Sequence, residues 1–231
     1  MRLRANFVLE RALWGKGVTA VAGVDEVGVG ALAGPVIAAA VILAPGTIIK
    51  GLADSKLLSA KRREALFEVI REDALAIGVG RAEVEEVERL NVYWAAMEAR
   101  RRAVEALELT PGHVLVDGKR RIAGCRLAQT PVVGGDALSG SVAAASIVAK
   151  VTRDSLMREY AQYHPGYGFE RHKGYATIAH LDALDRLGPL PLHRGSFAPV
   201  WMATSVQPQL RLWNDQPRDT PRRGMKRPVL L

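Results

Sequence analysis

The sequence predicts an α/β domain built on a mixed β-sheet that is flanked by helices. Two apolar runs near the N-terminus, Thr19–Val24 and Pro35–Leu43, flank a glycine-rich bend and are typical of a hairpin. After the hairpin, short β-type runs alternate with segments of helical periodicity, which is the order expected of an α/β fold. Residues 164–203 are richer in Gly, His, Arg and Lys, and they predict a small helical subdomain after a main domain of residues 1–163.

The remaining elements follow from caps, breakers and periodicity. Ser59 is a suitable N-cap for an amphipathic helix whose apolar side holds Leu66, Val69 and Ile70. Small residues at the start of the longest predicted helix suit close packing on a sheet. An acidic segment over residues 83–88 predicts a polar helix start that leads through Asn91 into a long helix. The predicted helices are Asn6–Trp14, Ala60–Asp73, Val92–Leu107, Ser141–Tyr163 and Ile178–Leu187; the further strands are Ala74–Arg81, His113–Val116 and Pro131–Val133.

Composition and charge narrow the function classes. The 231 residues carry 32 Lys and Arg against 24 Asp and Glu, a formal net charge of +8. Such an excess suggests a polyanionic partner, although many basic proteins bind no nucleic acid. A single cysteine, Cys125, excludes an internal disulfide and is better explained as a packed side chain than as a nucleophile. The charged N-terminus and the short apolar runs predict a cytoplasmic protein without a membrane span, and we expect a monomer.

Two consecutive carboxylates, Asp25 and Glu26, come at the end of the first apolar run. Neighbouring residues on a regular strand point to opposite faces, so if both serve one site we expect a bend or bulge there. Two other interpretations exist. A dinucleotide-binding loop is disfavoured because position 33 is Ala33 and a strand beginning with Pro35 follows. The other is a plain hairpin with a solvated acidic tip.

Two further acids stand where elements change. Asp117 follows the strand His113–Val116, and Asp136 comes just ahead of the longest helix. Each has an ordinary alternative, because Asp-Gly is a common turn and Asp before a helix is a common cap. If these acids meet the first pair, four close carboxylates require cations, and oxygen ligands select Mg²⁺ or Mn²⁺. Two such ions can catalyse in-line hydrolysis of a phosphodiester.

Several motifs, in order, resemble the bacterial ribonuclease HII family, the type 2 ribonucleases H. The motifs are GVDEVGVGALAGPVIAAAVIL, DSKLLS (Asp54–Ser59), VDGK (Val116–Lys119), GDALSGSVAAASIVAKVTRD (Gly135–Asp154), GYGFERHKGYAT (Gly166–Thr177) and HRGSFAPV (His193–Val200). The resemblance covers roughly residues 20–200. It implies a ribonuclease H-like mixed sheet. It also implies endonucleolytic cleavage of RNA in RNA–DNA hybrids and at ribonucleotides embedded in duplex DNA.

The resemblance also assigns catalytic roles to the four acids. Asp25, Glu26, Asp117 and Asp136 match the family's metal-binding acids, which activate a water and leave 5′-phosphate and 3′-hydroxyl ends. Two divalent ions, Mg²⁺ or Mn²⁺, are expected at the site. Two other classes remain as alternatives. One is a catalytically weakened hybrid-binding protein. The other is a different two-metal nuclease such as a junction resolvase, against which the DSKLLS and HKGYAT segments argue.

The substrate-binding residues implied by the resemblance lie in three segments. Gly28, Val29 and Gly30 match the loop whose backbone reads the ribose 2′-hydroxyl. Tyr175 matches a tyrosine that stacks at the junction sugar, and Lys56 matches a basic residue near the substrate phosphate. An ordinary half-buried tyrosine is the alternative for the former.

Two positions stay open beside this set. Lys150 and Arg153 either belong to the site or face the solvent as ordinary helix charges. The family usually has Gly-Arg-Gly where this chain has Val29 between its glycines. Valine lacks the guanidinium's charge-assisted hydrogen bonds to phosphate, so we expect weaker binding or relaxed selectivity with the cleavage chemistry retained.

The C-terminal residues 204–231 have a basic, Pro- and Gln-rich composition that predicts a disordered tail. Within them, Gln209–Trp213 resembles the pentapeptide by which bacterial proteins bind the sliding clamp. An idle tail is the alternative, because five-residue patterns arise often by chance.

Overall fold

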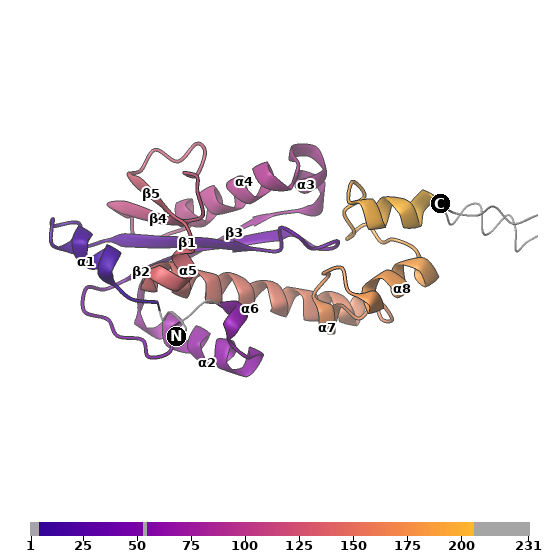
Figure 1. Ribbon diagram of the computed structural model, residues 1–231, viewed down its shortest axis with the longest axis horizontal. Coiled ribbons are helices and arrows are strands. Elements are labelled where there is room, and N and C mark those ends of the chain that lie inside the picture. The colour runs from indigo at the N-terminus through magenta and orange to yellow at the C-terminus, as the bar shows by residue number, and fades with distance from the viewer. Residues whose placement is uncertain (1–4, 53–54, 206–231) are drawn as a thin grey trace, which may run out of the picture.

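A computed structural model describes residues 5–52 and 55–205, and its centre is a five-stranded mixed sheet (Figure 1). The strand order is β3-β2-β1-β4-β5, in which β1–β2 and β2–β3 pair antiparallel while β1–β4 and β4–β5 pair parallel. The strands are β1 (Val21–Val27), β2 (Val36–Leu43), β3 (Ala74–Ala82), β4 (His113–Asp117) and β5 (Gln129–Val132). The α/β class and the mixed sheet expected from the sequence are confirmed.

Helices cover both faces of the sheet and extend beyond one end of it (Figure 1). The helices are α1 (Val8–Trp14), η1 (Ser55–Leu57), α2 (Ala60–Asp73), α3 (Val84–Leu90), α4 (Val92–Glu105), α5 (Gly135–Leu138), α6 (Gly140–Tyr163), α7 (Phe169–His172) and α8 (Ile178–Leu187). A last helical stretch spans residues 198–205, so it enters the region expected to be a disordered tail. In the described part of the chain, no helix is both long and apolar enough to span a bilayer.

The two faces of the sheet bury separate apolar clusters. Residues Ala22, Val24 and Ala38 pack under α4, whereas Ala39 and Val41 on the opposite face pack against α6. This alternation is what the period of a strand dictates. Because the two sides of β2 are both covered, its apolar run is continuous rather than alternating, as the sequence shows.

Glycine lets α6 approach β1 very closely. A Cβ added at Gly23 would lie 2.1 Å from the carbonyl carbon of Ser141 in the first turn of α6. Ser139 caps this helix by accepting a hydrogen bond from the Val142 amide at 3.2 Å. The close approach explains the small residues at the start of α6, and it fixes the helix against the strand that carries Asp25.

The structure corrects some element details. Ser59 caps α2 as predicted, and Leu66 and Ile70 are buried, but Val69 is 39% exposed. The acidic segment forms a separate helix, α3, and Asn91 caps α4 by accepting hydrogen bonds from the amides of Tyr93 and Trp94, the second and third residues of that helix. Cys125 is a free thiol that packs on the core under α4, as expected.

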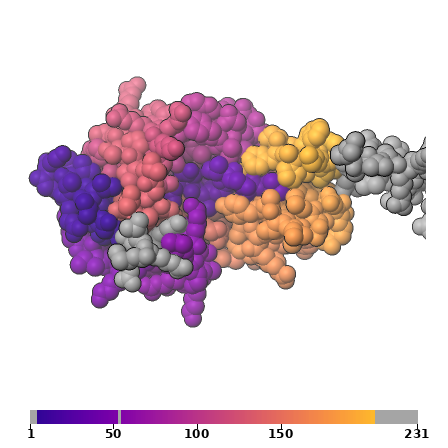
Figure 2. Space-filling model, viewed as in Figure 1, coloured from indigo at the N-terminus to yellow at the C-terminus, as the bar shows by residue number. Residues whose placement is uncertain are grey.

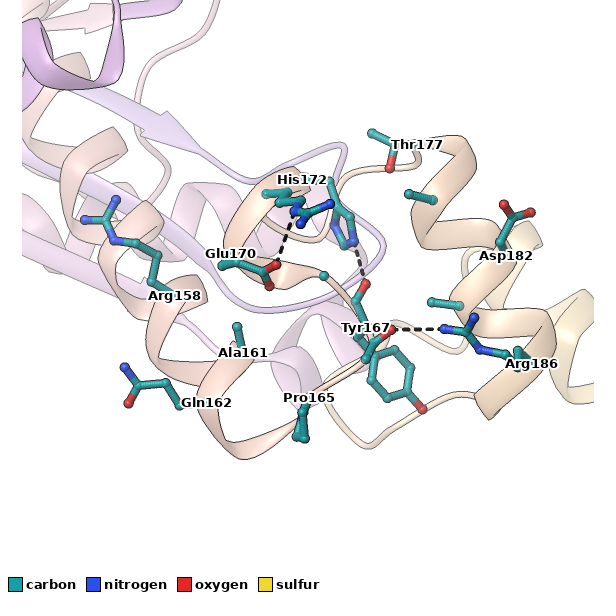
Figure 3. A pocket seen from close by; sticks show the side chains of 15 residues that line it. Arg158, Ala161, Gln162, Pro165, Tyr167, Glu170, His172, Thr177, Asp182 and Arg186 are labelled. Atoms are coloured by element: carbon teal, nitrogen blue, oxygen red, sulfur yellow. Dashed lines mark hydrogen bonds and ion pairs between the residues drawn. The ribbon is translucent and has the colours of Figure 1, made fainter.

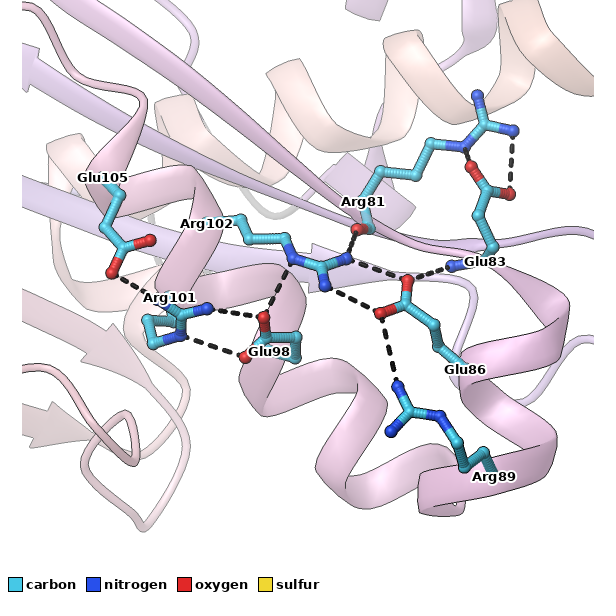
Figure 4. Close-up of polar contacts among 8 residues, drawn as sticks. All are labelled: Arg81, Glu83, Glu86, Arg89, Glu98, Arg101, Arg102 and Glu105. Atoms are coloured by element: carbon cyan, nitrogen blue, oxygen red, sulfur yellow. Dashed lines mark hydrogen bonds and ion pairs between the residues drawn. The ribbon is translucent and has the colours of Figure 1, made fainter.

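An ion-pair network ties α3 to α4 and β3 on the outer face (Figure 4). Arg102 donates two hydrogen bonds to the Glu86 carboxylate, at 2.8 and 2.7 Å, and a third to Glu98 at 2.9 Å. The Arg102 guanidinium lowers the pKa of Glu86 to about 2. The bidentate geometry makes this network a stronger tether than an isolated surface ion pair.

The chain after α6 forms a lobe at one end of the molecule (Figure 2). Its small core holds Met157, Tyr167, Phe169 and Ala183, and His180 and His193 are buried beside the Phe169 ring. Burial lowers the pKa of both histidines to about 4, so they are neutral at physiological pH. Whether residues 164–203 form an independent subdomain stays a prediction.

Candidate active site

The site begins at the carboxyl ends of two neighbouring parallel strands. In the β1–β4 register Val24 lies opposite Val116, so the next residues, Asp25 and Asp117, follow at the same level of the sheet. Paired positions of a parallel sheet place their side chains on the same face. The strands therefore bring together two acids that are 92 positions apart in the sequence.

Asp25 is the most deeply placed of these acids, with 6% of its surface exposed. Its carboxylate accepts a hydrogen bond from the Glu26 amide at 2.8 Å. Burial, and then the negative charges of Glu26 and Asp117, raise the pKa of Asp25 to about 8. A carboxyl that stays protonated near neutral pH because of burial and neighbouring acids is typical of functional sites.

Glu26 turns to the other face of the sheet. The register of β1 with β2 is continuous through Asp25 and Glu26, so the expected bend or bulge is absent from this pair. Arg100 of α4 donates a hydrogen bond from Nε to Glu26 Oε2 at 2.6 Å, and both side chains are largely buried. The side chains of Asp25 and Glu26 therefore lie on opposite faces of the sheet. Asp25 lies on the face covered by α6, and Glu26 is paired with an arginine of α4 on the other face.

Asp117 and Asp136 are linked through the start of α5. The Gly135 amide donates to Asp117 Oδ1 at 2.7 Å, which places the neighbouring residue Asp136 close to the end of β4. Asp136 lies in the first turn of α5 rather than at its N-cap, which is Gly134, so the capping alternative is wrong. The Lys56 ammonium lies 4.0 Å from Asp136 Oδ2 and is 80% exposed; Asp54 lies outside the described residues.

Carboxylates of this kind fit divalent cations by their chemistry. Asp25, Glu26 and Asp117 lie close enough for their charges to raise the pKa of Asp25, and a hard cation would relieve that repulsion. The arrangement is not a ready cage, however. Within residues 5–52 and 55–205, no three His, Cys, Asp or Glu side chains are placed to share one metal ion.

The glycine-rich bend projects beside these acids as a tight turn. The Ala31 amide donates to the Gly28 carbonyl at 3.3 Å, so Val29 and Gly30 are the central residues of the turn. Gly28 has a φ of 92°, and a Cβ there would lie 2.3 Å from Arg153 Nε. Among the described residues, the Val29 and Gly30 amides donate to no protein acceptor. These amides are available to a ligand.

Two buried arginines hold the bend; the sequence left the role of Arg153 open, and Arg194 was not found from it. Arg153 donates to the carbonyls of Pro35, Ala33 and Lys173 at 2.9–3.0 Å. Both Arg153 and Arg194 are fully buried, so the interpretation of Arg153 as a solvent-facing charge is wrong.

Arg194 holds the same bend from the other side. It donates to the Gly34 carbonyl, at 3.1 and 2.8 Å, and to the Val29 carbonyl at 2.9 Å. Both arginines lie in motifs that carried the family resemblance. Their position in these motifs was the signal in the sequence that could have marked them as site residues.

Tyr175 lies against the bend from the C-terminal lobe. It pairs with Ala31 in an isolated antiparallel bridge, and its side chain is half-buried. Lys150 Nζ and Arg153 Cζ lie 5.7 and 5.4 Å from the centre of its ring, which is cation–π distance. Lys150 also pairs with Asp154 at 2.7 Å. The structure thus brings Tyr175 to the bend but surrounds it with cations.

A pocket of about 1080 Å³ lies in the C-terminal lobe. It is lined by the end of α6, by α7 and by α8 (Figure 3). None of the four acids lines it. Figure 3 shows two of its basic side chains bound to backbone carbonyls of the lining, His172 to that of Tyr167 and Arg186 to that of Gly166. We therefore place the chemistry at the acids and not in this cavity.

The fold is similar to that of solved ribonucleases H. The chain superimposes on the ribonuclease H2 of Pyrococcus horikoshii with a TM-score of 0.68 and 24% identity, over 80% of this chain and 97% of that one. It also resembles the ribonuclease HII of Archaeoglobus fulgidus, solved in complex with PCNA. That likeness has a TM-score of 0.63 and 25% identity, over 77% and 95% of the two chains.

Sequence comparison narrows this class. The chain belongs to the ribonuclease HII family, whose model matches residues 22–200, and it is a nuclease of the ribonuclease H type. Ribonuclease HII of Koribacter versatilis is 48% identical over 95% of this chain and 85% of its own length. That of Moorella thermoacetica is 53% identical over 85% and 95% of the two chains. The resemblance noted in the sequence is thus confirmed.

The raised pKa of Asp25 predicts that the protein without divalent cations loses stability as the pH rises. Between the ordinary value of 3.8 and about 8, the folded state keeps this proton and the unfolded state has lost it. The folded state therefore binds more protons in this window, so each rise in pH favours unfolding. We expect a decline of roughly 3–5 kcal/mol in the free energy of unfolding, measured by urea denaturation in EDTA.

Asp25→Asn cannot titrate and should remove most of this decline. Asp73→Asn, at an exposed position at the end of α2, is the matched control and should keep it. An Asp25→Asn variant with the full wild-type pH dependence would contradict the assignment.

Proposed function

We propose that this chain is a divalent-metal-dependent endoribonuclease that hydrolyses the RNA strand of RNA–DNA hybrids. We propose further that it cleaves at ribonucleotides embedded in duplex DNA and leaves 5′-phosphate and 3′-hydroxyl ends. Family membership supports the hybrid substrate. The observation that carries the rest is the placement of Asp25 beside Asp117 at the strand ends, next to a turn with free backbone amides.

The four acids have separate tasks in this proposal. Asp25, Glu26, Asp117 and Asp136 would hold Mg²⁺ or Mn²⁺, and two such ions would stabilise the attacking and leaving oxygens of the phosphodiester. Asp117 is oriented by the Gly135 amide, and Glu26 is held in place by Arg100. The exposed Lys56, beside Asp136, is placed to attract a substrate phosphate into the site.

The bend supplies the selectivity for a ribose. The amides of Val29 and Gly30 are free to donate to a 2′-hydroxyl, which a deoxyribose lacks. Tyr175 supports the bend through its bridge to Ala31 and offers a half-buried ring for the sugar beside the cleaved bond. Because Arg153 and Arg194 bind the carbonyls of the bend, its amides are left to face outward.

The test is cleavage of a DNA duplex that contains one ribonucleotide, with Mg²⁺ or Mn²⁺. We expect Asp117→Asn to lower kcat by about 100-fold or more and to leave Kd within about threefold of wild type. Asparagine keeps the oxygen that accepts the Gly135 hydrogen bond but loses the charge. Asp73→Asn, on the surface of α2, should cleave normally.

Two results would contradict the proposal. Wild-type kcat in Asp117→Asn would remove this acid from the catalytic set. A wild-type protein that binds the duplex but never cleaves it would favour the hybrid-binding alternative.

Val29 predicts reduced selectivity for a lone ribonucleotide. Its side chain packs on the core under α4 and carries no donor for phosphate. We expect Val29→Arg to bind the single-ribonucleotide duplex about tenfold more tightly, because one charge-assisted hydrogen bond to phosphate contributes roughly 1.5–3 kcal/mol. Unchanged kinetics and affinity, measured on this duplex and on an all-RNA hybrid, would discard the prediction.

We further propose that Gln209–Trp213 binds the bacterial sliding clamp. These residues lie outside the described part of the chain, so the proposal rests on the pentapeptide itself. The Archaeoglobus relative, which was solved with PCNA, offers indirect support. Deletion of residues 206–231 should abolish capture of the chain by immobilised clamp while cleavage is kept. Undiminished capture would refute the assignment.

A further inference from the structure

A side pocket opens next to the candidate active site. It has a volume of about 300 Å³. Two of the four acids, Glu26 and Asp117, form the wall that faces the candidate active site. Val29 of the bend forms a second wall. The remaining walls come from the first turns of α4 and from residues 118–120, directly after β4. None of the substrate-binding residues inferred from the motifs, apart from Val29, lines this pocket.

The loop after β4 makes one side of the pocket strongly basic. Lys119 and Arg120 line it and are exposed. Between Asp117 and Asp136 the chain carries four basic residues and no acidic one. Arg100 also lines the pocket, but its guanidinium is paired with Glu26. The exposed positive charge of the pocket therefore belongs to the loop, and it favours an anionic ligand.

The opposite side is aromatic. Tyr93, in the first turn of α4, lines this side and is 41% exposed. Its neighbour Trp94 does not line the pocket, but its ring meets the Tyr93 ring edge to face at 5.0 Å. The Asn91 side chain accepts hydrogen bonds from both of their amides, which fixes this turn. Arg120 Cζ lies over the Tyr93 ring, 6.0 Å from its centre, so the cation and the aromatic ring lie together at the pocket within cation–π distance.

We propose that this pocket binds the nucleic-acid strand next to the cleaved bond, with Lys119 and Arg120 on its phosphates and Tyr93 against a base or sugar. The inference rests on the proposed function. Exposed cations beside an aromatic ring are the combination with which proteins hold a single nucleic-acid strand. The loop after β4, through Lys119 and Arg120, then supplies next to Val29 the positive charge that the bend itself lacks.

The test measures binding and cleavage separately, on a duplex that contains one ribonucleotide. Kd is obtained by fluorescence anisotropy without divalent cations, between about 50 and about 200 mM salt. For Lys119→Ala/Arg120→Ala we expect a Kd about tenfold higher at the lower salt. The slope of log Kd against log salt should fall by about 2, because each cation releases about one counterion. With Mg²⁺, KM should rise similarly while kcat stays within about twofold of wild type.

A matched control separates a local contact from general charge. Arg11→Ala/Lys16→Ala also removes two exposed cations, but at α1, which lies at the opposite end of β1 from the bend (Figure 1). Its Kd should stay within about twofold of wild type. Tyr93→Leu should bind about five- to tenfold more weakly, whereas Tyr93→Phe, which keeps the ring, should bind normally. Circular dichroism checks that each variant is folded.

The outcomes distinguish the pocket from the proposed function. Wild-type Kd and salt slope in folded Lys119→Ala/Arg120→Ala would overturn the pocket, and so would an equal loss in the α1 control. If the wild-type chain binds with these dependences but does not cleave, the pocket is supported and the proposed function fails. If it cleaves and the loop variant binds as wild type, the function stands and the pocket is rejected.

Discussion

The parallel pairing of β1 with β4 is the interaction on which the site depends. Its register sets Asp25 and Asp117 at one level and on one face of the sheet, although the two acids are 92 positions apart in the sequence. The α6 helix holds this register, because it packs directly on Gly23 and leaves no room for a Cβ there. A slip of one residue would turn Asp117 to the opposite face. The contribution of the Asp117 charge to the raised pKa of Asp25 would then be lost, together with the shared site.

The bend beside these acids depends on a different device, two buried guanidinium groups without a carboxylate partner. Arg153 and Arg194 donate hydrogen bonds to backbone carbonyls of the bend, and Arg153 also donates to the Lys173 carbonyl in the C-terminal segment. Burial and the neighbouring charge of Arg153 lower the pKa of Arg194 to about 10, so it remains charged at physiological pH. Because charged donors make strong hydrogen bonds, the carbonyls are held inward. The lobe after α6 is thereby connected to the turn at Val29 and Gly30.

Local sequence patterns predicted most of the helices and strands, but they did not predict contacts between residues that are far apart in the sequence. The helix Ile178–Leu187 matches its predicted bounds, since a Thr177 cap and an ending glycine mark it in the sequence. Arg153 could not be placed in this way. An arginine in a helix is ordinarily solvated, and only partners 118 and 120 positions away reveal that it is buried. The bend or bulge that was expected if Asp25 and Glu26 served one site is absent. Glu26 turns instead to Arg100 of α4, which is 74 positions along the chain and could not be foreseen from local patterns.

The position of the acid pair across the sheet gives its two members different roles. Glu26 is paired with Arg100, whereas burial and the charges of Glu26 and Asp117 raise the pKa of Asp25 to about 8. A proton and a divalent cation compete for the same carboxylate, so a cation that binds Asp25 at neutral pH must release that proton. In the proposed metal site, ion binding at Asp25 would therefore be coupled to proton release. The burial that makes Asp25 costly as an anion also makes a cation there more effective, since fewer waters screen its charge.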